Sequence, residues 1–401
     1  MKKLLFILFI GIGGVYAQNV ADNNVSFDFI QLPTNPVDPQ VNTYKIVINK
    51  LFEVSNEDSL NMYQVRLNAA QSNYDAQMEV WKQQKKAIDR QYLSTLAVWE
   101  KNNLANNTST PQPQCPPYPP QPILEEVRQP ELHDDIADQF ANGKIKLEGF
   151  TAGDGGVTVT LDINPISDLK IVKTIKGSGS ATKFIYECEY KLPVGVKVEC
   201  PMRGVVFNTI VGNTVRKKAI NTFTTTYDFQ IWMLDNRESF WVDLQKEARE
   251  SVMNEISAVL NDNCGFPLKK RSTEVYSVNK HKDFSYPELT EAYTTALQGY
   301  RLIVQRRDRT DAADKLYEAI TIWENALKES NMADNKSRIN DKITAMIHYN
   351  MAEAYLWLNQ YDECEKYANL AIADDVFKFK GPAHALKNYL VERRKRWNAN
   401  Y

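Results

Sequence analysis

The chain has 401 residues, of which 43% are hydrophobic and 24% are charged. These values are typical of a soluble globular protein with two or three domains. Forty-eight basic residues against fifty acidic ones leave a formal net charge of -2. No whole-chain field therefore attracts a polyanion, and nucleic acid is not expected as a partner.

The first feature in chain order is a secretory signal at residues 1–17. It joins Lys2 and Lys3 to an apolar run and ends at Ala17, the order of a signal peptidase I substrate. The run is about ten residues long, too short to cross a bilayer, and Gln18 follows where a lipoprotein would have cysteine. We expect export to the periplasm or outer envelope, no transmembrane segment, and at most peripheral membrane association.

A strand at residues 43–48 precedes a long helix that contains no Gly or Pro from Asp58 to Ala105. Its apolar residues recur at steps of three and four, with Lys85 filling one gap, which predicts one apolar stripe: Leu67, Ala70, Tyr74, Met78, Trp81, Ile88, Tyr92, Leu96 and Trp99. A continuous helix would be about 70 Å long. The favoured interpretation packs it on the C-terminal helices, with a helical hairpin or homo-oligomerisation through the helix as alternatives.

The segment PQPQCPPYPPQP, residues 111–122, follows the helix. Its prolines forbid regular structure and favour an extended chain. We interpret it as a stiff spacer that returns from the helix tip, in preference to a ligand for an aromatic groove.

From residue 144 to 233 the hydrophobic period becomes two, and turn residues divide the region into about seven strands. The last of these strands covers residues 220–233, and a helix is expected from Arg237 to Leu260. The pattern predicts an antiparallel, sandwich-like β-rich domain. If residues 43–48 form its first strand, the long helix is an insertion.

Five cysteines remain in a chain predicted to be exported. Cys188 and Cys200 flank Pro193, Val194 and Gly195, and a hairpin there would place the two thiols opposite each other. Two free or buried thiols are the alternative to a disulfide. No CxxC motif occurs, so no structural zinc site is expected.

Small and aromatic residues alternate at helical spacing near the C-terminus. They include Ala319, Trp323 and Ala326, then Ala352, Tyr355, Tyr361, Cys364 and Ala371. The pattern over about 317–375 resembles the tetratricopeptide repeat (TPR), a family of stacked helical hairpins. The resemblance implies a concave docking surface.

Similarity to that family assigns four residues of residues 345–375 to the partner-binding groove: Tyr349, Asn350, Glu353 and Leu356. The alternative is that this face packs on the β-rich domain or the long helix. The basic cluster ERRKRW, residues 392–397, is interpreted as a solvated helix end, with an acidic partner or lipid headgroups as alternatives.

Catalytic signatures are not evident. His133, Asp134 and Asp135 have metal-ligand chemistry but no second His at ligand spacing, and no G-x-S-x-G elbow occurs. We therefore expect no catalytic residue, cofactor or metal. The predicted function is an exported non-enzymatic scaffold or adaptor of a bacterial cell-envelope assembly that binds another protein. An envelope hydrolase of glycan or peptide, with an acid pair in the β-rich domain, is the alternative, and a small-ligand carrier is a third hypothesis.

The predicted α+β multidomain organisation has six parts. These are the signal peptide 1–17, a leader and first strand 18–54, the long helix 55–105, the proline-rich linker 106–143, the β-rich domain with its helix 144–265, and the TPR-like helical domain 266–401.

Overall fold

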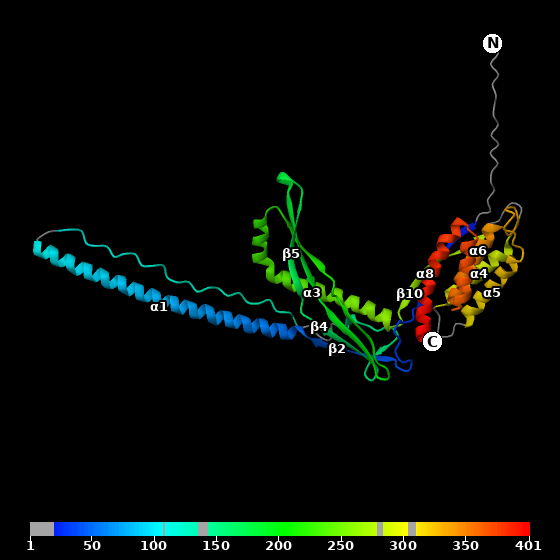
Figure 1. Ribbon diagram of the computed structural model, residues 1–401, viewed down its shortest axis with the longest axis horizontal. Helices are drawn as coiled ribbons and strands as arrows, with labels where there is room; N and C mark the ends of the chain where they lie inside the picture. Colours follow the sequence, from blue (N-terminus) through cyan, green and yellow to red (C-terminus); the bar gives the residue numbers. More distant parts are fainter. Residues whose placement is uncertain (1–19, 107–108, 135–142, 279–283, 304–309) are drawn as a thin grey trace, which may run out of the picture.

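The computed structural model describes residues 20–106, 109–134, 143–278, 284–303 and 310–401, so the signal peptide lies outside the described residues. The described chain is an α+β protein, as the sequence predicts. It has a β-rich body, a long helix that projects from one side of the body, and a domain of five packed helices on the other side (Figure 1).

A five-stranded sheet forms the centre of the body, in the order β3-β2-β4-β7-β8. Its strands are β2 (Thr43–Lys50), β3 (Thr151–Ala152), β4 (Val157–Ile163), β7 (Val194–Cys200) and β8 (Gly204–Val211). Strand β2 pairs parallel with β3 and β4, and everything between β2 and β3 is thus inserted into the sheet. The expected insertion of the long helix is confirmed.

A second sheet, in the order β5-β6-β9, is built from β5 (Ser167–Lys176), β6 (Lys183–Lys191) and β9 (Arg216–Phe223). The short 3-10 turn η1 (Gly179–Ala181) lies between β5 and β6. The seventh strand expected over residues 220–233 is wrong beyond Phe223.

Helix α3 (Thr226–Asn263) begins there because the Thr225 hydroxyl accepts a hydrogen bond from the Asp228 N–H at 3.1 Å. The Asp228 carboxylate in turn accepts one from the Thr225 N–H at 3.0 Å. This capping box is a strong helix start, and its Thr-x-x-Asp signal was present in the sequence.

The core of the body lies between the five-stranded sheet and α3. Alternate residues of β4 and β7 are buried, as a sheet with one covered face requires. Helix α3 supplies the covering apolar side chains Leu244, Ala248, Val252, Met253, Ile256 and Leu260. The second layer over this sheet is therefore a helix.

The hairpin expected between Cys188 and Cys200 is wrong. Cys188 lies in β6 and Cys200 ends β7, and these strands belong to different sheets. Strand β7 already begins at Val194, directly after Pro193, so the chain passes from one sheet to the other without turning back. Both thiols are free and buried.

The C-terminal domain combines helices with a two-stranded ribbon. Strand β1 (Val20–Ile30) pairs antiparallel with β10 (Leu268–Val278) over the full length of both. The helices are α4 (Pro287–Leu302), α5 (Thr310–Leu327), α6 (Asp341–Trp357), α7 (Tyr361–Ala373) and α8 (Phe377–Asn400). One hydrophobic core joins the ribbon to all five helices, so part of the predicted leader belongs to this domain.

Helix α1 (Phe52–Asn106) is continuous, and only Phe52 of its 55 residues is buried. It projects away from the C-terminal helices (Figure 1), so the expectation that it packs on them is wrong. Across the described residues, no helix is both long enough and apolar enough to cross a membrane.

Candidate interaction surfaces

The predicted groove lies on α6, and all four of its residues are buried. Tyr349 is 4% exposed, and Asn350, Glu353 and Leu356 are 0% exposed. The face that the resemblance assigns to a partner is thus covered in this structure.

Strand β10 is the covering element. The Asn350 amide donates to the Tyr276 carbonyl at 2.8 Å, and its oxygen accepts from the Tyr276 N–H at 3.0 Å. Both polar groups of the Asn350 side chain therefore bind the main chain of Tyr276 in the protein's own strand β10. The ring of Tyr349 meets the ring of Tyr276 edge to face at 5.4 Å between centroids. The face is therefore packed within the protein, but its cover is the ribbon of the helical domain and neither the β-rich domain nor the long helix that the alternative named.

A buried charge completes the same contact. One Glu353 oxygen accepts from Trp357 Nε1 at 3.0 Å, and the other lies 3.5 Å from the Arg271 guanidinium of β10. Burial, reinforced by the negative charge of Glu353, raises the pKa of the Tyr349 phenol, so the phenol stays protonated. Glu353 is thus a structural ion-pair partner of β10.

The signal for β1 was visible in the sequence, although its pairing partner was not. Val25, Phe27 and Phe29 alternate with polar residues, and all three are buried. Phe27 and Phe29 both meet the indole of Trp357, at centroid distances of 4.8 and 5.0 Å. The Trp357 indole is therefore part of the core.

The proline-rich segment returns along α1, which confirms the predicted spacer (Figure 1). Asn56 near the helix start donates to the His133 carbonyl at 2.8 Å, and Thr110 near the tip donates to Asn103 at 2.9 Å. The helix needs about 47 residues at ~1.5 Å each between these two contacts. The extended chain needs about 23 residues at ~3.1 Å each. Both lengths are about 70 Å, so the two segments match without slack. We call residues 56–106 with 109–133 the projecting hairpin.

The apolar stripe of α1 faces the returning chain. Trp81 Nε1 donates to the Pro119 carbonyl at 2.8 Å, and the Tyr118 hydroxyl donates to Asp89 at 2.6 Å. Lys85 fills the gap in the stripe, with its ammonium 5.7 Å from the Trp81 ring and 5.1 Å from the Tyr118 ring. These stripe residues are only half-buried, because one extended chain is all that covers them.

The root of the projecting hairpin is held by His133. Its Nε2 accepts from the Ile166 N–H at 3.0 Å, so Nδ1 carries the proton and faces Asn56 Oδ1 at 3.4 Å. The ring also packs against Trp241 of α3 at 5.5 Å. Burial first, then the positive charge of Arg249, lowers the pKa of His133 from its ordinary value of 6.5. His133, which has the chemistry of a metal ligand, is thus a neutral structural histidine. Asp135 lies outside the described residues.

Within the basic cluster at residues 392–397, Lys395 is exposed, as the predicted solvated helix end requires, but Arg396 is buried. Arg396 donates to the Asp262 carboxylate, to the Asp262 and Leu32 carbonyls and to Glu392, at 2.8 to 2.9 Å. Arg394 pairs with acids of α7. Arg396 thereby fastens α8 to the end of α3 in the body.

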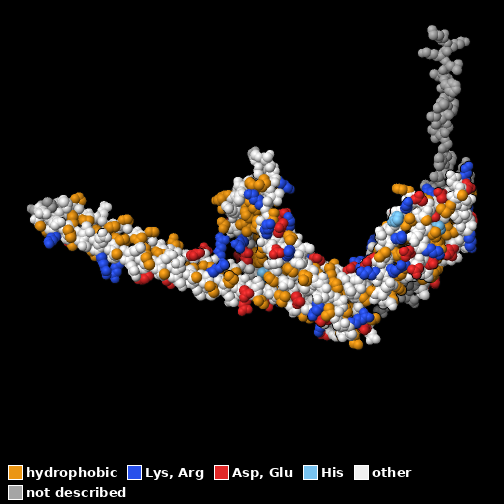
Figure 2. All heavy atoms as spheres, viewed as in Figure 1, with side chains coloured by type: hydrophobic (Ala, Val, Ile, Leu, Met, Phe, Trp, Pro, Cys, Tyr) orange, Lys and Arg blue, Asp and Glu red, His pale blue; other side chains and the backbone are white. Residues whose placement is uncertain are grey.

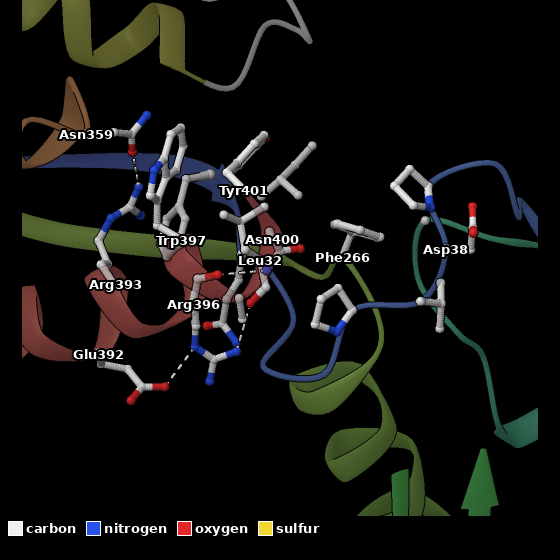
Figure 3. A pocket seen from close by; sticks show the side chains of 18 of the residues that line it. Leu32, Asp38, Phe266, Asn359, Glu392, Arg393, Arg396, Trp397, Asn400 and Tyr401 are labelled. Carbon is white, nitrogen blue, oxygen red and sulfur yellow. Dashed lines mark hydrogen bonds and ion pairs between the residues drawn. The ribbon is translucent and has the colours of Figure 1, made fainter. Parts of the chain in front are cut away.

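A cleft of about 760 Å³ lies beside this junction, between the body and the helical domain (Figure 3). We call it the interdomain cleft. One wall comes from residues 29–42 with Gly149, Phe150, Arg203 and Phe266, and the other comes from the α6–α7 turn and the last turns of α8. The sequence did not reveal it, because residues 29–42 precede Asn359 of the other wall by more than 300 residues, and even Phe266 precedes it by 93.

The described residues hold no cluster of three or more His, Cys, Asp or Glu side chains arranged for a metal ion. The protein as a class has three parts (Figure 1): the projecting hairpin, a β-rich body and a helical domain. No family model, curated protein or solved structure matches the chain. The resemblance of residues 317–375 to the TPR family therefore stays a prediction.

Proposed function

We propose that this chain is an exported, non-enzymatic scaffold of a bacterial cell envelope that binds another protein through the projecting hairpin. The observation that carries the proposal is the exposure of α1, in which one residue of 55 is buried. A helix that adds so little to the core contributes reach and contact surface instead. The proposed docking surface is therefore the projecting hairpin and not the covered α6 face.

The exposed side of the hairpin offers apolar side chains to a partner. Hydrophobic side chains are spread along the projection in Figure 2. They include Met62, Val65, Val80, Leu93, Val98 and Leu104, each more than half exposed. Apolar contacts set among charges are typical of protein–protein contact surfaces.

A shortened arm tests the proposal. In the variant, a short Gly-Ser linker replaces residues 68–127 and joins Leu67 of α1 to Arg128 of the returning chain. These two residues lie at about the same distance from the root of the hairpin, because a helix rises ~1.5 Å per residue and an extended chain ~3.1 Å. The Asn56–His133 contacts remain. The full-length mature chain carries Cys115→Ser, because this exposed thiol would form artefactual disulfides in an oxidising compartment, and the shortened chain lacks residue 115.

Partners are captured from envelope fractions, identified, and rebound as purified proteins to both chains. We expect a partner that binds the full arm directly and loses at least tenfold in affinity for the shortened arm. Equal affinity for the two chains contradicts the role of the hairpin. Failure to find the mature chain in the envelope fraction contradicts the location.

The hydrolase alternative requires two carboxylates that share one pocket. Asp38 and Glu392 both line the interdomain cleft, but they do not point toward each other in Figure 3. Glu392 is also engaged by Arg396 at 2.8 Å. Asp235, Glu238 and Asp243 of α3 share a second hollow, but this hollow is shallow and open, whereas a ligand pocket encloses most of its ligand.

A further inference from the structure

The interdomain cleft has a second feature besides its size, an excess of positive charge near its walls. Of its three arginines, Arg396 is matched by Asp262 and Glu392. Within the described chain, Arg203 donates only to the Pro36 carbonyl at 3.0 Å, and Arg393 has only the neutral Asn359 oxygen at 3.3 Å. Two guanidinium groups therefore face the cleft without a carboxylate.

Arg393 is the more constrained of the two. Its guanidinium carbon lies 4.1 Å from the Trp357 ring centroid and 5.5 Å from that of Phe29, and its Nε is buried without a hydrogen-bond partner. A guanidinium held on aromatic faces is pre-organised to bind a carboxylate. A buried donor left unpaired is costly unless a ligand satisfies it.

Further aromatic rings line the same cleft. Trp397 of α8 meets Tyr361 at 6.1 Å and Tyr401 at 4.2 Å between centroids. Phe150 and Phe266 form a tilted pair at 6.0 Å on the body side. Tyr401 is 81% exposed at the edge of the cleft. An aromatic wall beside an unpaired arginine is the chemistry that recognises an aromatic or apolar side chain next to a carboxylate.

We propose that the interdomain cleft is a peptide-binding site for a partner segment that carries an aromatic or large apolar residue next to a carboxylate. The carboxylate binds Arg393, with Arg203 contributing charge from the opposite wall, and the side chain packs against Trp397 and the facing Phe266. Clefts of this volume that lie at domain junctions are common ligand sites. The proposal rests on the scaffold function only in taking a protein as the ligand, and it does not involve the projecting hairpin.

The probe is a pool of random hexapeptides with amidated C-termini, equilibrated with the immobilised mature chain and read by mass spectrometry. We expect captured peptides to be enriched in Asp or Glu beside an aromatic or large apolar residue. Arg393→Gln should reduce the enrichment about tenfold, the effect of losing one charge-assisted hydrogen-bonded pair. No enrichment with the unmodified chain overturns the proposal.

Two further variants separate binding from folding. Arg394→Gln changes the next residue, whose partners are Asp362 and Glu365 outside the cleft, and it should bind as the unmodified chain does. Ala399→Trp fills the cleft from α8 without removing any charge, and it should abolish capture while the melting temperature stays unchanged. Enrichment that survives Arg393→Gln or Ala399→Trp contradicts this site.

Competition identifies the kind of ligand. N-acetylphenylalanine carries the same ring and carboxylate but no peptide chain, so it should displace the captured peptides at least tenfold less effectively than they displace each other. Equal competition overturns the peptide assignment. A failure of this experiment leaves the arm proposal intact, because the shortened chain retains the cleft.

Discussion

Helices α1 and α6 show two opposite uses of an apolar helix. In α6, fourteen of 17 residues are buried, whereas α1 buries one of 55. The difference lies in the number of covering elements, since α6 is enclosed by the β1–β10 ribbon and its neighbouring helices, and α1 has only the proline-rich chain. Helix length thus says little about how much of a helix contributes to a core.

The two helices are also stabilised by different interactions. Along α1, exposed side-chain pairs four residues apart recur, such as Gln64 with Asn68 and Gln71 with Asp75. Each such pair adds a few tenths of a kcal/mol. In α6 the stability comes from tertiary packing and from buried polar contacts with β10. Mutations in α6 should therefore unfold its domain, whereas mutations in α1 should act locally.

The largest effect is expected at Glu353. Glu353→Ala leaves Arg271 and the Trp357 N–H without their partner, and breaking a buried ion pair costs about 3–5 kcal/mol. Denaturant unfolding followed by tryptophan fluorescence measures the loss. The matched control is Glu363→Ala in α7, whose pair with Lys366 is exposed and is worth about 0–1 kcal/mol. A loss below about 1 kcal/mol at Glu353 would contradict the interpretation of α6 as a core helix.

The next effect concerns the junction of the two domains. Arg396→Ala removes three hydrogen bonds from α8 to Asp262 of α3 and to Leu32, and a fourth to Glu392 within α8, and we expect a loss of about 2–4 kcal/mol. Small-angle scattering should show a wider distribution of domain orientations. Arg394→Ala serves as the control, because its ion pairs are on the surface. An unchanged scattering profile for Arg396→Ala would mean that other contacts hold the junction.

A smaller, local effect is expected on the arm. Trp81→Ala removes the hydrogen bond to the Pro119 carbonyl and a half-buried ring, which together are worth about 1–2 kcal/mol. Protease cleavage within residues 111–122 should accelerate, while the melting temperature of the body stays constant. Val80→Ala, one position away and 54% exposed, should change neither. Equal cleavage rates for the two variants would show that the stripe does not hold the returning chain.

The smallest effect is a pH dependence at the root of the arm. The folded pKa of His133 is lowered below 6.5 by burial and by Arg249, with Asp134 opposing the shift. The unfolded state therefore binds a proton first, and the stabilising contribution is complete above about pH 6.5 and declines as the pH falls toward the folded pKa. The protection factor of the Ile166 amide, which corrects for the intrinsic pH dependence of exchange, should fall over this range. The same profile in His133→Asn would assign the effect to other groups.

Some elements could be read from local patterns. The stripe of α1 and the prolines of residues 111–122 each predict a shape by themselves, and the structure confirms the helix and its returning spacer. The parallel pairing of β2 with β4 follows only once the insertion between them is recognised. The α3 boundary was missed by eleven residues because β-branched residues near Thr226 favour a strand, and the capping box decides otherwise.

The covered groove could not have been predicted in the same way. Val20 of β1 pairs with Val278 of β10, and no local pattern records a contact across that separation. Asn350 resembles a residue that grips a ligand, and in the structure it grips the main chain of Tyr276. Its chemistry was readable from the sequence, but the identity of the strand it binds was not.

The sequence by itself determined which faces of this protein need cover, because hydrophobic periods of two and of three to four residues are local properties of the chain. Only the tertiary structure decided what covers each face: a proline-rich chain on α1, the protein's own ribbon on α6, and none of the described residues over the interdomain cleft. The physical reason is that apolar burial is not directional. Many surfaces can satisfy one apolar face, and the complete set of competing contacts selects among them.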